Sequence, residues 1–402
     1  MQNTLALHIL SVFILITTVS LSYGEISRAS NADDTVIPKQ ISHESVGILE
    51  EFLKRLVEQN QIPGVAVGIV KNQKLIWARG IGYADIENKI PASPTTLYRL
   101  ASTSKPFAAV LIMQLVEQGK LTLDTPMAKF RVPPRHREKP TLVRHVLSHT
   151  SEWTPGERFD YSGDAYSDLT LVIEETATKS YPDILKMNIF DPTGMDRTSP
   201  GMWAVGYEKA MHDLAVPYEF AGGKLERSAY PVIVCNWSAT REQQWTIVGF
   251  LKTVEDVTRR EILGDRYTPL YGGVNASGGI VSNIVDLAKF DAALDSGKLV
   301  NETSRNLMFT PTLSNDKKVL PYGLGWFVQE INETKVVWHY GHFPPIASSL
   351  YLKIPEHNLT FFLLANTSRL SDSHGLQEGD VMRSPYATLF LDHFIFKGGD
   401  SE

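Results

Sequence analysis

Strand-forming segments stand at both ends of this 402-residue chain, and helical patterns fill its middle. Runs of apolar and β-branched residues bounded by turn residues predict strands in both places. The predicted strands are residues 64–70, 74–79, 319–329, 335–339, 348–353 and 359–365. The first two form a hairpin, and the last four form a consecutive meander. Because neither group makes a large core alone, the pattern predicts one antiparallel sheet that both ends of the chain build together.

Helical spacing of apolar residues predicts the layers around this sheet. The segments 46–57 and 385–396 each carry an apolar face, so we expect these terminal helices to flank the sheet. Further helices are predicted after residue 105, over 166–178 and over 280–294. The expected fold class is therefore α/β, of the α+β type. Within a domain of residues 43–400, the sheet part comprises 43–97 and 317–400, and the mainly helical part comprises 98–316.

Composition narrows the class of protein. The chain is 43% hydrophobic and 21% charged, which is ordinary for a globular protein with a large core. Its net charge is −6, and the basic cluster from Arg131 to Arg144 is short and broken by prolines, so nucleic-acid binding is disfavoured. Cys235 is the single cysteine, so an intrachain disulfide is impossible.

The first 24 residues form a separate unit. Residues 9–21 are mostly apolar, and Ser22-Tyr23-Gly24 places small residues where a signal peptidase would cut. We therefore expect a cleaved signal peptide over residues 1–24 and a secreted or periplasmic protein, with an uncleaved N-terminal anchor as second choice. Residues 25–42 are a polar spacer. No later segment is long and apolar enough to cross a bilayer, so no stable membrane span is expected after cleavage.

The tetrapeptide Ser102-Thr103-Ser104-Lys105 stands directly before an apolar helical run. Positions i and i+3 share a helix face, so the serine hydroxyl and the lysine amine should point into one pocket. Serine becomes a nucleophile when a base takes its proton, and burial turns lysine into such a base. Lowering the lysine pKa from about 10.4 to about 7 requires roughly 4.6 kcal/mol. A second S-x-x-K, Ser314 to Lys317, lies in a polar stretch and is attributed to chance.

Two other elements carry chemistry. Tyr161 lies in a turn-rich loop, residues 155–164, before a predicted helix, and beside a cationic lysine its phenol should have a lowered pKa and act as a base. His339-Tyr340-Gly341-His342 stands at the end of a predicted strand, where glycine permits close approach of a ligand. The amide after Gly341 and that of Ser102 would form an oxyanion hole, and His339 would donate to the charged end of a substrate.

Four further stretches resemble the serine β-lactamase and penicillin-binding-protein-like family, which includes class C β-lactamases, D-alanyl-D-alanine carboxypeptidases and related esterases. The S-x-x-K, Tyr-Ser and H-x-G elements occur in the order of that family, and the likeness runs from about Glu44 to the C-terminal helix. The resembling stretches are Ile62 to Val67, Arg79 to Asp85, Val146 to Ser151 and Ala276 to Ile280.

The resemblance implies a role for each site residue. Ser102 would be the nucleophile, Lys105 its proton partner and Tyr161 the general base. His339 and Gly341 would lie on the strand flanking the pocket, and the amide of His342 would complete the oxyanion hole.

Two departures from the family pattern bear on specificity. Gly163 stands where relatives often carry an asparagine that holds an amide of the substrate. His339 replaces the lysine of many β-lactamases, and this H-x-G form looks closer to the carboxypeptidase and esterase branches.

Other chemistries fit less well. Ser277 lacks the first glycine of a G-x-S-x-G elbow, since Asn275 stands there. His145 and His149 are four residues apart without the glutamate of an H-E-x-x-H zinc motif. We therefore expect no metal and no organic cofactor.

The expected function is a serine hydrolase that acts on an ester or amide through an acyl-enzyme on Ser102, of the carboxypeptidase or esterase type. A class C-type β-lactamase is one alternative, and a non-catalytic β-lactamase-like binding protein is another. The expected partner is a small-molecule or peptide substrate. The sequence leaves the natural substrate and the oligomeric state open.

Overall fold

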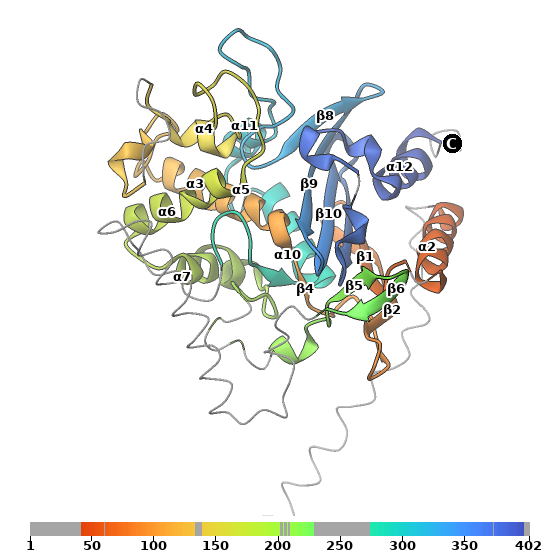
Figure 1. Ribbon diagram of the computed structural model, residues 1–402. Coiled ribbons are helices and arrows are strands. Elements are labelled where there is room, and N and C mark those ends of the chain that lie inside the picture. Colours follow the sequence, from red (N-terminus) through yellow and green to blue (C-terminus); the bar gives the residue numbers. More distant parts are fainter. Residues whose placement is uncertain are drawn as a thin grey trace, which may run out of the picture. The chain divides into compact units, whose positions relative to one another are not determined.

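One antiparallel sheet joins the two ends of the chain. The computed structural model describes residues 42–59, 61–132, 139–201, 204, 207, 210–228, 274–372 and 374–397, all within the compact unit Lys39–Glu402. Seven strands follow the order β3-β2-β1-β11-β10-β9-β8, and Figure 1 shows β8, β9 and β10 side by side in blue. The strands are β1 Gly64–Lys71, β2 Lys74–Asp85, β3 Ile90–Pro91, β8 Phe327–Ile331, β9 Thr334–Phe343, β10 Ala347–Ile354 and β11 Leu359–Ala365.

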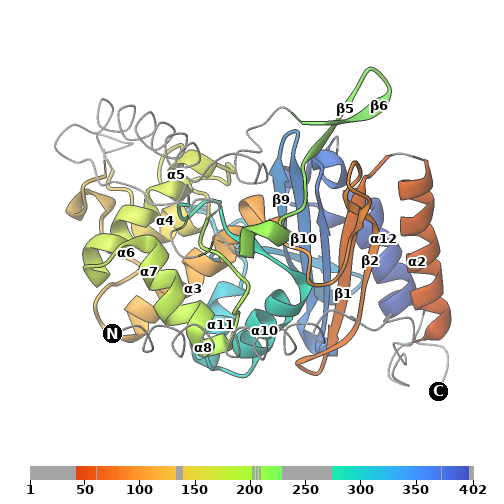
Figure 2. The same ribbon diagram turned by 90° about the horizontal axis from the view of Figure 1, so that it is seen from below.

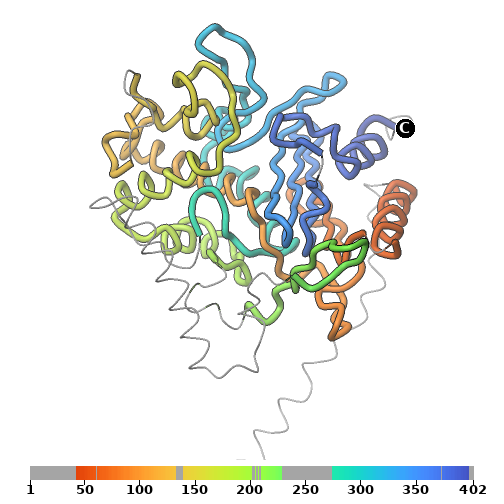
Figure 3. The backbone as a smooth tube through the Cα atoms, viewed as in Figure 1, coloured from red at the N-terminus to blue at the C-terminus, as the bar shows by residue number. Residues whose placement is uncertain are grey.

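The junction between the two ends is the pairing of β1 with β11. These strands run antiparallel from Val65↔Ala365 to Lys71↔Leu359. The backbone tube shows the orange N-terminal hairpin beside the blue C-terminal strands (Figure 3). Every residue of β11 is buried, so this central strand is covered on both faces, and Thr360 is its one polar residue. The predicted split sheet is therefore confirmed.

The terminal helices cover one face of the sheet. Helix α2, His43–Glu58, begins where the Ser42 side chain accepts a hydrogen bond from the Ser45 amide, and helix α12, Pro385–Leu391, has the same kind of cap at Ser384. The rings of Phe52 and Tyr386 lie 5.8 Å apart and join the two helices. Figure 2 shows both helices on the same side of the strands.

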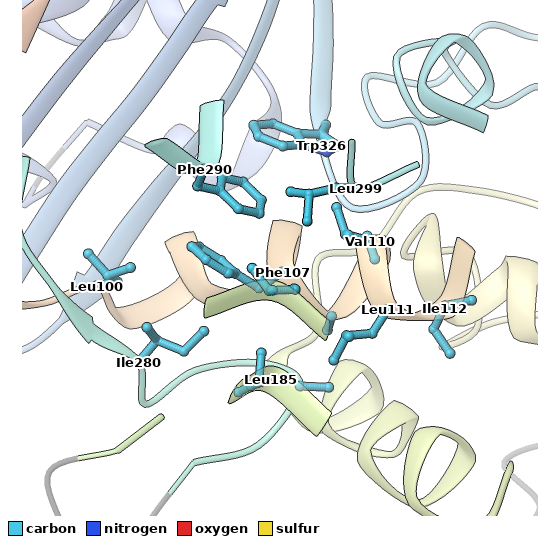
Figure 4. Close-up of a cluster of buried hydrophobic side chains, with 14 of the residues drawn as sticks. Leu100, Phe107, Val110, Leu111, Ile112, Leu185, Ile280, Phe290, Leu299 and Trp326 are labelled. Carbon is cyan, nitrogen blue, oxygen red and sulfur yellow. The ribbon is translucent and has the colours of Figure 1, made fainter. Parts of the chain in front are cut away.

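The opposite face packs against the helical region. Phe107 of helix α3, Lys105–Glu117, stacks on Phe290 of helix α10, Ile284–Asp295, with ring centroids 4.0 Å apart. The labelled side chains of Figure 4 form one apolar cluster around this pair, between α3, α10 and the sheet. The other helices are α4 Val143–Leu147, α5 Gly163–Ser167, α6 Leu169–Ala177, α7 Tyr181–Leu185, α8 Asp191–Thr193 and α11 Glu302–Met308.

Two short strand pairs complete the described elements. Strand β4, Tyr98–Arg99, which ends shortly before the S-x-x-K segment, pairs with strand β7, Val281–Ser282. Strands β5, Tyr218–Ala221, and β6, Lys224–Arg227, form a small hairpin.

Several predicted boundaries differ from the structure. Strand β8 begins at Phe327 rather than at residue 319, because residues 319–326 form turns and isolated bridges. Strand β9 continues through Phe343, so His339 to His342 lie inside a strand rather than at its end. Helix α10 begins at Ile284, after an Asn283 cap, and the preceding residues belong to β7. The helix predicted over 166–178 is two helices, α5 and α6.

The predicted signal peptide, residues 25–41 of the spacer, and Cys235 lie outside the described residues. Within the described part of the chain, no helix combines the length and apolarity that a membrane span requires.

The stacked pair of Phe107 and Phe290 should be a main contact between helices α3 and α10. We expect Phe107→Ala to lower the free energy of unfolding by about 3–5 kcal/mol, because it removes a fully buried ring and leaves a cavity. Phe220→Ala, at a side chain 44% exposed, should change it by about 1 kcal/mol or less. Urea unfolding followed by circular dichroism measures both, and equal losses would contradict this assignment.

Candidate active site

Ser102 lies in a strained turn between β4 and α3. Residues Ala101–Ser104 form a 3₁₀ turn, and α3 begins directly afterwards at Lys105. Ala101 has φ 47°, a left-handed conformation that is uncommon for a residue with a side chain. Such backbone strain persists only where the surroundings fix it, and it is frequent at functional sites.

The two inner strands hold this turn. The Ser349 hydroxyl on β10 donates to the Leu100 carbonyl at 2.8 Å and lies 2.7 Å from the Thr103 hydroxyl. On β9, a side chain at Gly341 would come within 2.2 Å of the Leu100 carbonyl oxygen, so this position requires glycine. The backbone of β9 thus lies directly against the segment that leads into Ser102.

Lys105 is buried beside the serine. Its amine donates hydrogen bonds to the Ser102 hydroxyl at 2.9 Å and to the Ser277 carbonyl at 3.1 Å. The side chain has no exposed surface, and this burial lowers the pKa of Lys105 to about 7. Near neutral pH a substantial fraction of the amine is therefore uncharged, and in that form it can accept the serine proton.

Tyr161 lies over the same amine. The Lys105 nitrogen is 4.9 Å from the centre of the Tyr161 ring, and that ring stacks against Phe327 at 5.7 Å. Burial raises the pKa of Tyr161 well above its usual range, while the facing Ser102 side chain lowers it by less. Among the described residues, no group makes a hydrogen bond of full geometry to the buried hydroxyl.

The direction of this shift differs from the sequence-based expectation. We expected a cationic lysine to lower the tyrosine pKa, but burial dominates at both groups and favours the neutral amine and the neutral phenol.

His339 has both ring nitrogens engaged inside the protein. Its Nδ1 donates to the Tyr340 carbonyl at 2.7 Å, so its Nε2 accepts from the Tyr322 hydroxyl at 2.9 Å. Burial lowers the pKa of His339 well below its ordinary value, so the ring is neutral. We expected His339 to donate a hydrogen bond to the charged end of a substrate. In the structure its one N–H is instead bonded to the Tyr340 carbonyl.

The remaining predicted site residues lie on β9 and at the start of α5. The His342 ring bonds to Asp372 at 2.7 Å, so only its backbone is a candidate for the oxyanion hole. Gly163 opens α5, and a Cβ there would meet nothing within 4 Å. At the second S-x-x-K, the Ser314 hydroxyl donates to Asp316 instead of facing a lysine. Within the described part of the chain, Ser102 thus has a lysine amine as hydrogen-bond partner and Ser314 has a carboxylate.

Sequence reasoning missed two residues that shape this site. Ser277 was weighed only as a nucleophile, whereas its backbone carbonyl receives the lysine amine. Ser349 carries no motif, because its role depends on strand pairing that places it beside Gly341. A backbone carbonyl leaves no sequence signal, whereas the alternation along β10 would have placed Ser349 on the same face as Tyr351.

Burial of Lys105 should destabilise the protein below pH 10.5. The unfolded chain binds the lysine proton more tightly than the folded one, so this penalty is full below about pH 7 and fades as pH rises to 10.5. We expect Lys105→Met to raise the free energy of unfolding at pH 7 by about 2 kcal/mol or more.

Urea unfolding at pH 7 and pH 10 measures this gain, which should shrink at the higher pH. Lys74→Met, on an exposed lysine, should change stability by less than about 0.5 kcal/mol at both. A gain that is absent at pH 7, or that is equal at both pH values, would contradict the burial argument.

Comparisons with known proteins show the family and the fold. The sequence profile of the Beta-lactamase family matches residues 49–378. The chain is 24% identical to penicillin-binding protein 4* of Bacillus subtilis over 354 residues, 79% of this chain and 71% of that protein. Many solved structures share the fold, and two examples follow.

The first is D-amino acid amidase from Ochrobactrum anthropi, with TM-score 0.65, 20% identity, and coverage of 89% of this chain and 100% of that one. The second is EstCE1, a hydrolase with promiscuous acyltransferase activity, with TM-score 0.62, 19% identity, and coverage of 86% and 98%. The chain belongs to the β-lactamase family of serine hydrolases.

Proposed function

We propose that this enzyme is exported and hydrolyses an ester or amide through an acyl-enzyme on Ser102. The observation that carries the proposal is the fully buried Lys105 amine, 2.9 Å from the Ser102 hydroxyl and with a pKa lowered to about 7. Lysine in this state is a base suited to neutral pH. The export rests on the predicted signal peptide over residues 1–24.

Acylation follows from the positions of three groups. Ser102 Oγ forms a bond to the substrate carbonyl carbon while Lys105 Nζ takes its proton. The amides of Ser102 and His342 are proposed to hold the resulting oxyanion, a contribution of roughly 3–4 kcal/mol to lowering the barrier. When the carbonyl re-forms, the leaving group departs and takes a proton.

We assign that proton to Tyr161. Because its pKa is raised, Tyr161 is a neutral phenol that gives its proton to the leaving group and regains one from the lysine ammonium. Water then attacks the acyl-enzyme as its proton passes through Tyr161 and Lys105 back to Ser102. The general-base role that the family resemblance implies for Tyr161 is therefore a relay: the neutral phenol takes the proton of the water while it passes its own to Lys105, which is the base that receives it.

The site favours esters over peptides. Gly163 offers no side chain to hold a substrate amide, and the single N–H of His339 is bonded to the Tyr340 carbonyl. An ester needs neither group. Among the solved structures of the same fold, EstCE1 is a hydrolase and the Ochrobactrum anthropi protein is a D-amino acid amidase, so the preference for an ester rests on Gly163 and His339.

A fluorophosphonate probe tests the nucleophile. We expect it to label the protein at Ser102. Ser102→Ala should abolish the labelling and lower p-nitrophenyl ester turnover at least a thousandfold. Ser314→Ala, in the second S-x-x-K, should keep both.

Labelling of Ser102→Ala equal to that of the wild type would remove the proposal. A wild-type protein that neither labels nor turns over esters, D-amino-acid peptides or nitrocefin would favour the non-catalytic alternative. Nitrocefin turnover faster than ester turnover would favour the class C-type β-lactamase.

Gly163 provides a test of substrate class. The space beside it admits a larger side chain, so Gly163→Asn should fold normally. We expect it to raise kcat/KM for an amide relative to the matched ester by roughly five- to tenfold, the value of one hydrogen bond. Gly163→Ala fills the space without an amide and should leave the ratio unchanged. If both variants leave the ratio unchanged, Gly163 does not set the preference.

A further inference from the structure

His149, which is outside the predicted site, accepts hydrogen bonds from the two backbone amides that flank Tyr161 in the chain. The backbone amide of Asp160 donates to the His149 carbonyl at 2.8 Å, and the amide of Ser162 donates to His149 Nδ1 at 3.1 Å. Tyr161 stands between these two amides in the chain. His149 therefore binds the backbone immediately before and immediately after the tyrosine.

The His149 ring also packs on the tyrosine itself. The two ring centroids are 4.3 Å apart with the planes tilted by 37°. Tyr322, whose hydroxyl bonds to His339, meets the same imidazole edge-on at 4.8 Å. The imidazole is thus enclosed by aromatic rings and packs directly against the Tyr161 ring.

His149 has an unusual backbone that makes this double contact possible. Its φ is 54°, in the left-handed region, at a fully buried position. Non-glycine residues adopt that conformation where the surrounding contacts fix it. In this conformation its carbonyl meets Asp160 and its ring meets Ser162.

The tautomer of His149 follows from its partners. Because Nδ1 accepts from a backbone N–H, the ring proton is on Nε2. That Nε2 is buried and has no hydrogen-bond partner among the residues that the structure describes. A ring kept for packing alone would not need this acceptor.

We propose that His149 is a positioning residue, which fixes the Tyr161 hydroxyl relative to Ser102 and Lys105 through its Nδ1 acceptor. The proposal rests on the hydrolase function proposed above. A structural role alone predicts changes in stability, whereas positioning predicts a loss of kcat at constant KM, since Tyr161 acts in proton transfer rather than in substrate binding.

Two substitutions of His149 by residues with an amide side chain distinguish a positioning role from a purely structural one. His149→Asn places an oxygen where Nδ1 stands, and asparagine tolerates the left-handed backbone. His149→Gln places its oxygen near the position of Nε2, out of reach of the Ser162 amide. We expect kcat for a p-nitrophenyl ester to stay within about threefold of wild type in the asparagine variant and to fall at least tenfold in the glutamine variant, with KM unchanged in both.

His145 offers a matched control. It lies four residues earlier and also accepts a backbone N–H at Nδ1, from Leu142 at 3.1 Å. His145→Gln breaks the same kind of bond away from Tyr161, so it should lower the melting temperature without changing kcat. If His149→Gln does not fold, His149→Gly replaces it, because glycine suits the backbone and lacks the acceptor.

Equal kcat values for the asparagine and glutamine variants, or an equal loss in the His145 control, would overturn the proposal while leaving an active wild-type enzyme. A crystal structure of His149→Gln (or His149→Gly) with Tyr161 unmoved would overturn it as well. Failure of the hydrolase function is distinct, because the wild-type protein itself would then show no turnover that depends on Ser102, and the proposal would fall with it.

Discussion

The burial of one lysine amine is the constraint on which the site depends. Lys105 begins a helix that is buried along nearly its whole length, and among the described residues its amine has a serine hydroxyl and a backbone carbonyl at hydrogen-bond distance. Removing a charge from water is costly, so the group shifts toward its neutral form instead. The stacked rings of Phe107 and Phe290 and the sheet behind them provide the packing that offsets this cost.

The same burial gives the amine and the phenol complementary properties. It favours the neutral form of both, which lowers the pKa of Lys105 and raises that of Tyr161. Paired groups whose pKa values are pushed apart divide into a base and an acid. His339, buried in the same cluster, is held neutral by the same effect and is engaged with Tyr322. Burial therefore shifts Lys105, Tyr161 and His339 in the same sense, toward their uncharged forms.

Features of the fold and the site that depend on local sequence patterns could be predicted from the sequence. The split sheet and its terminal helices follow from apolar periodicity, which is a local property. The proximity of Ser102 and Lys105 likewise follows from their i,i+3 spacing. The start of β8 was misplaced because Val319 to Trp326 includes apolar residues that resemble a strand, whereas the isolated Tyr322↔Phe327 bridge marks a turn before Phe327.

Properties that arise from long-range burial were not available in the sequence. The sign of the Tyr161 shift depends on how deeply its loop is covered, and the locked His339 ring depends on Tyr322, 17 residues away along the chain. The hydrogen bonds between His149 and the backbone around Tyr161 depend on the left-handed conformation of His149, which a histidine in the sequence does not indicate. These features become visible only when β9, α3 and the Tyr161 loop are seen together.

The rate of Ser102 phosphonylation as a function of pH tests the central claim most directly. The second-order rate constant reports the pKa of the free enzyme's base. If buried Lys105 is that base, the rate should rise with pH through a midpoint of about 7 and level off above it. A rate that keeps rising toward pH 10, as for a solvated lysine, would contradict the account.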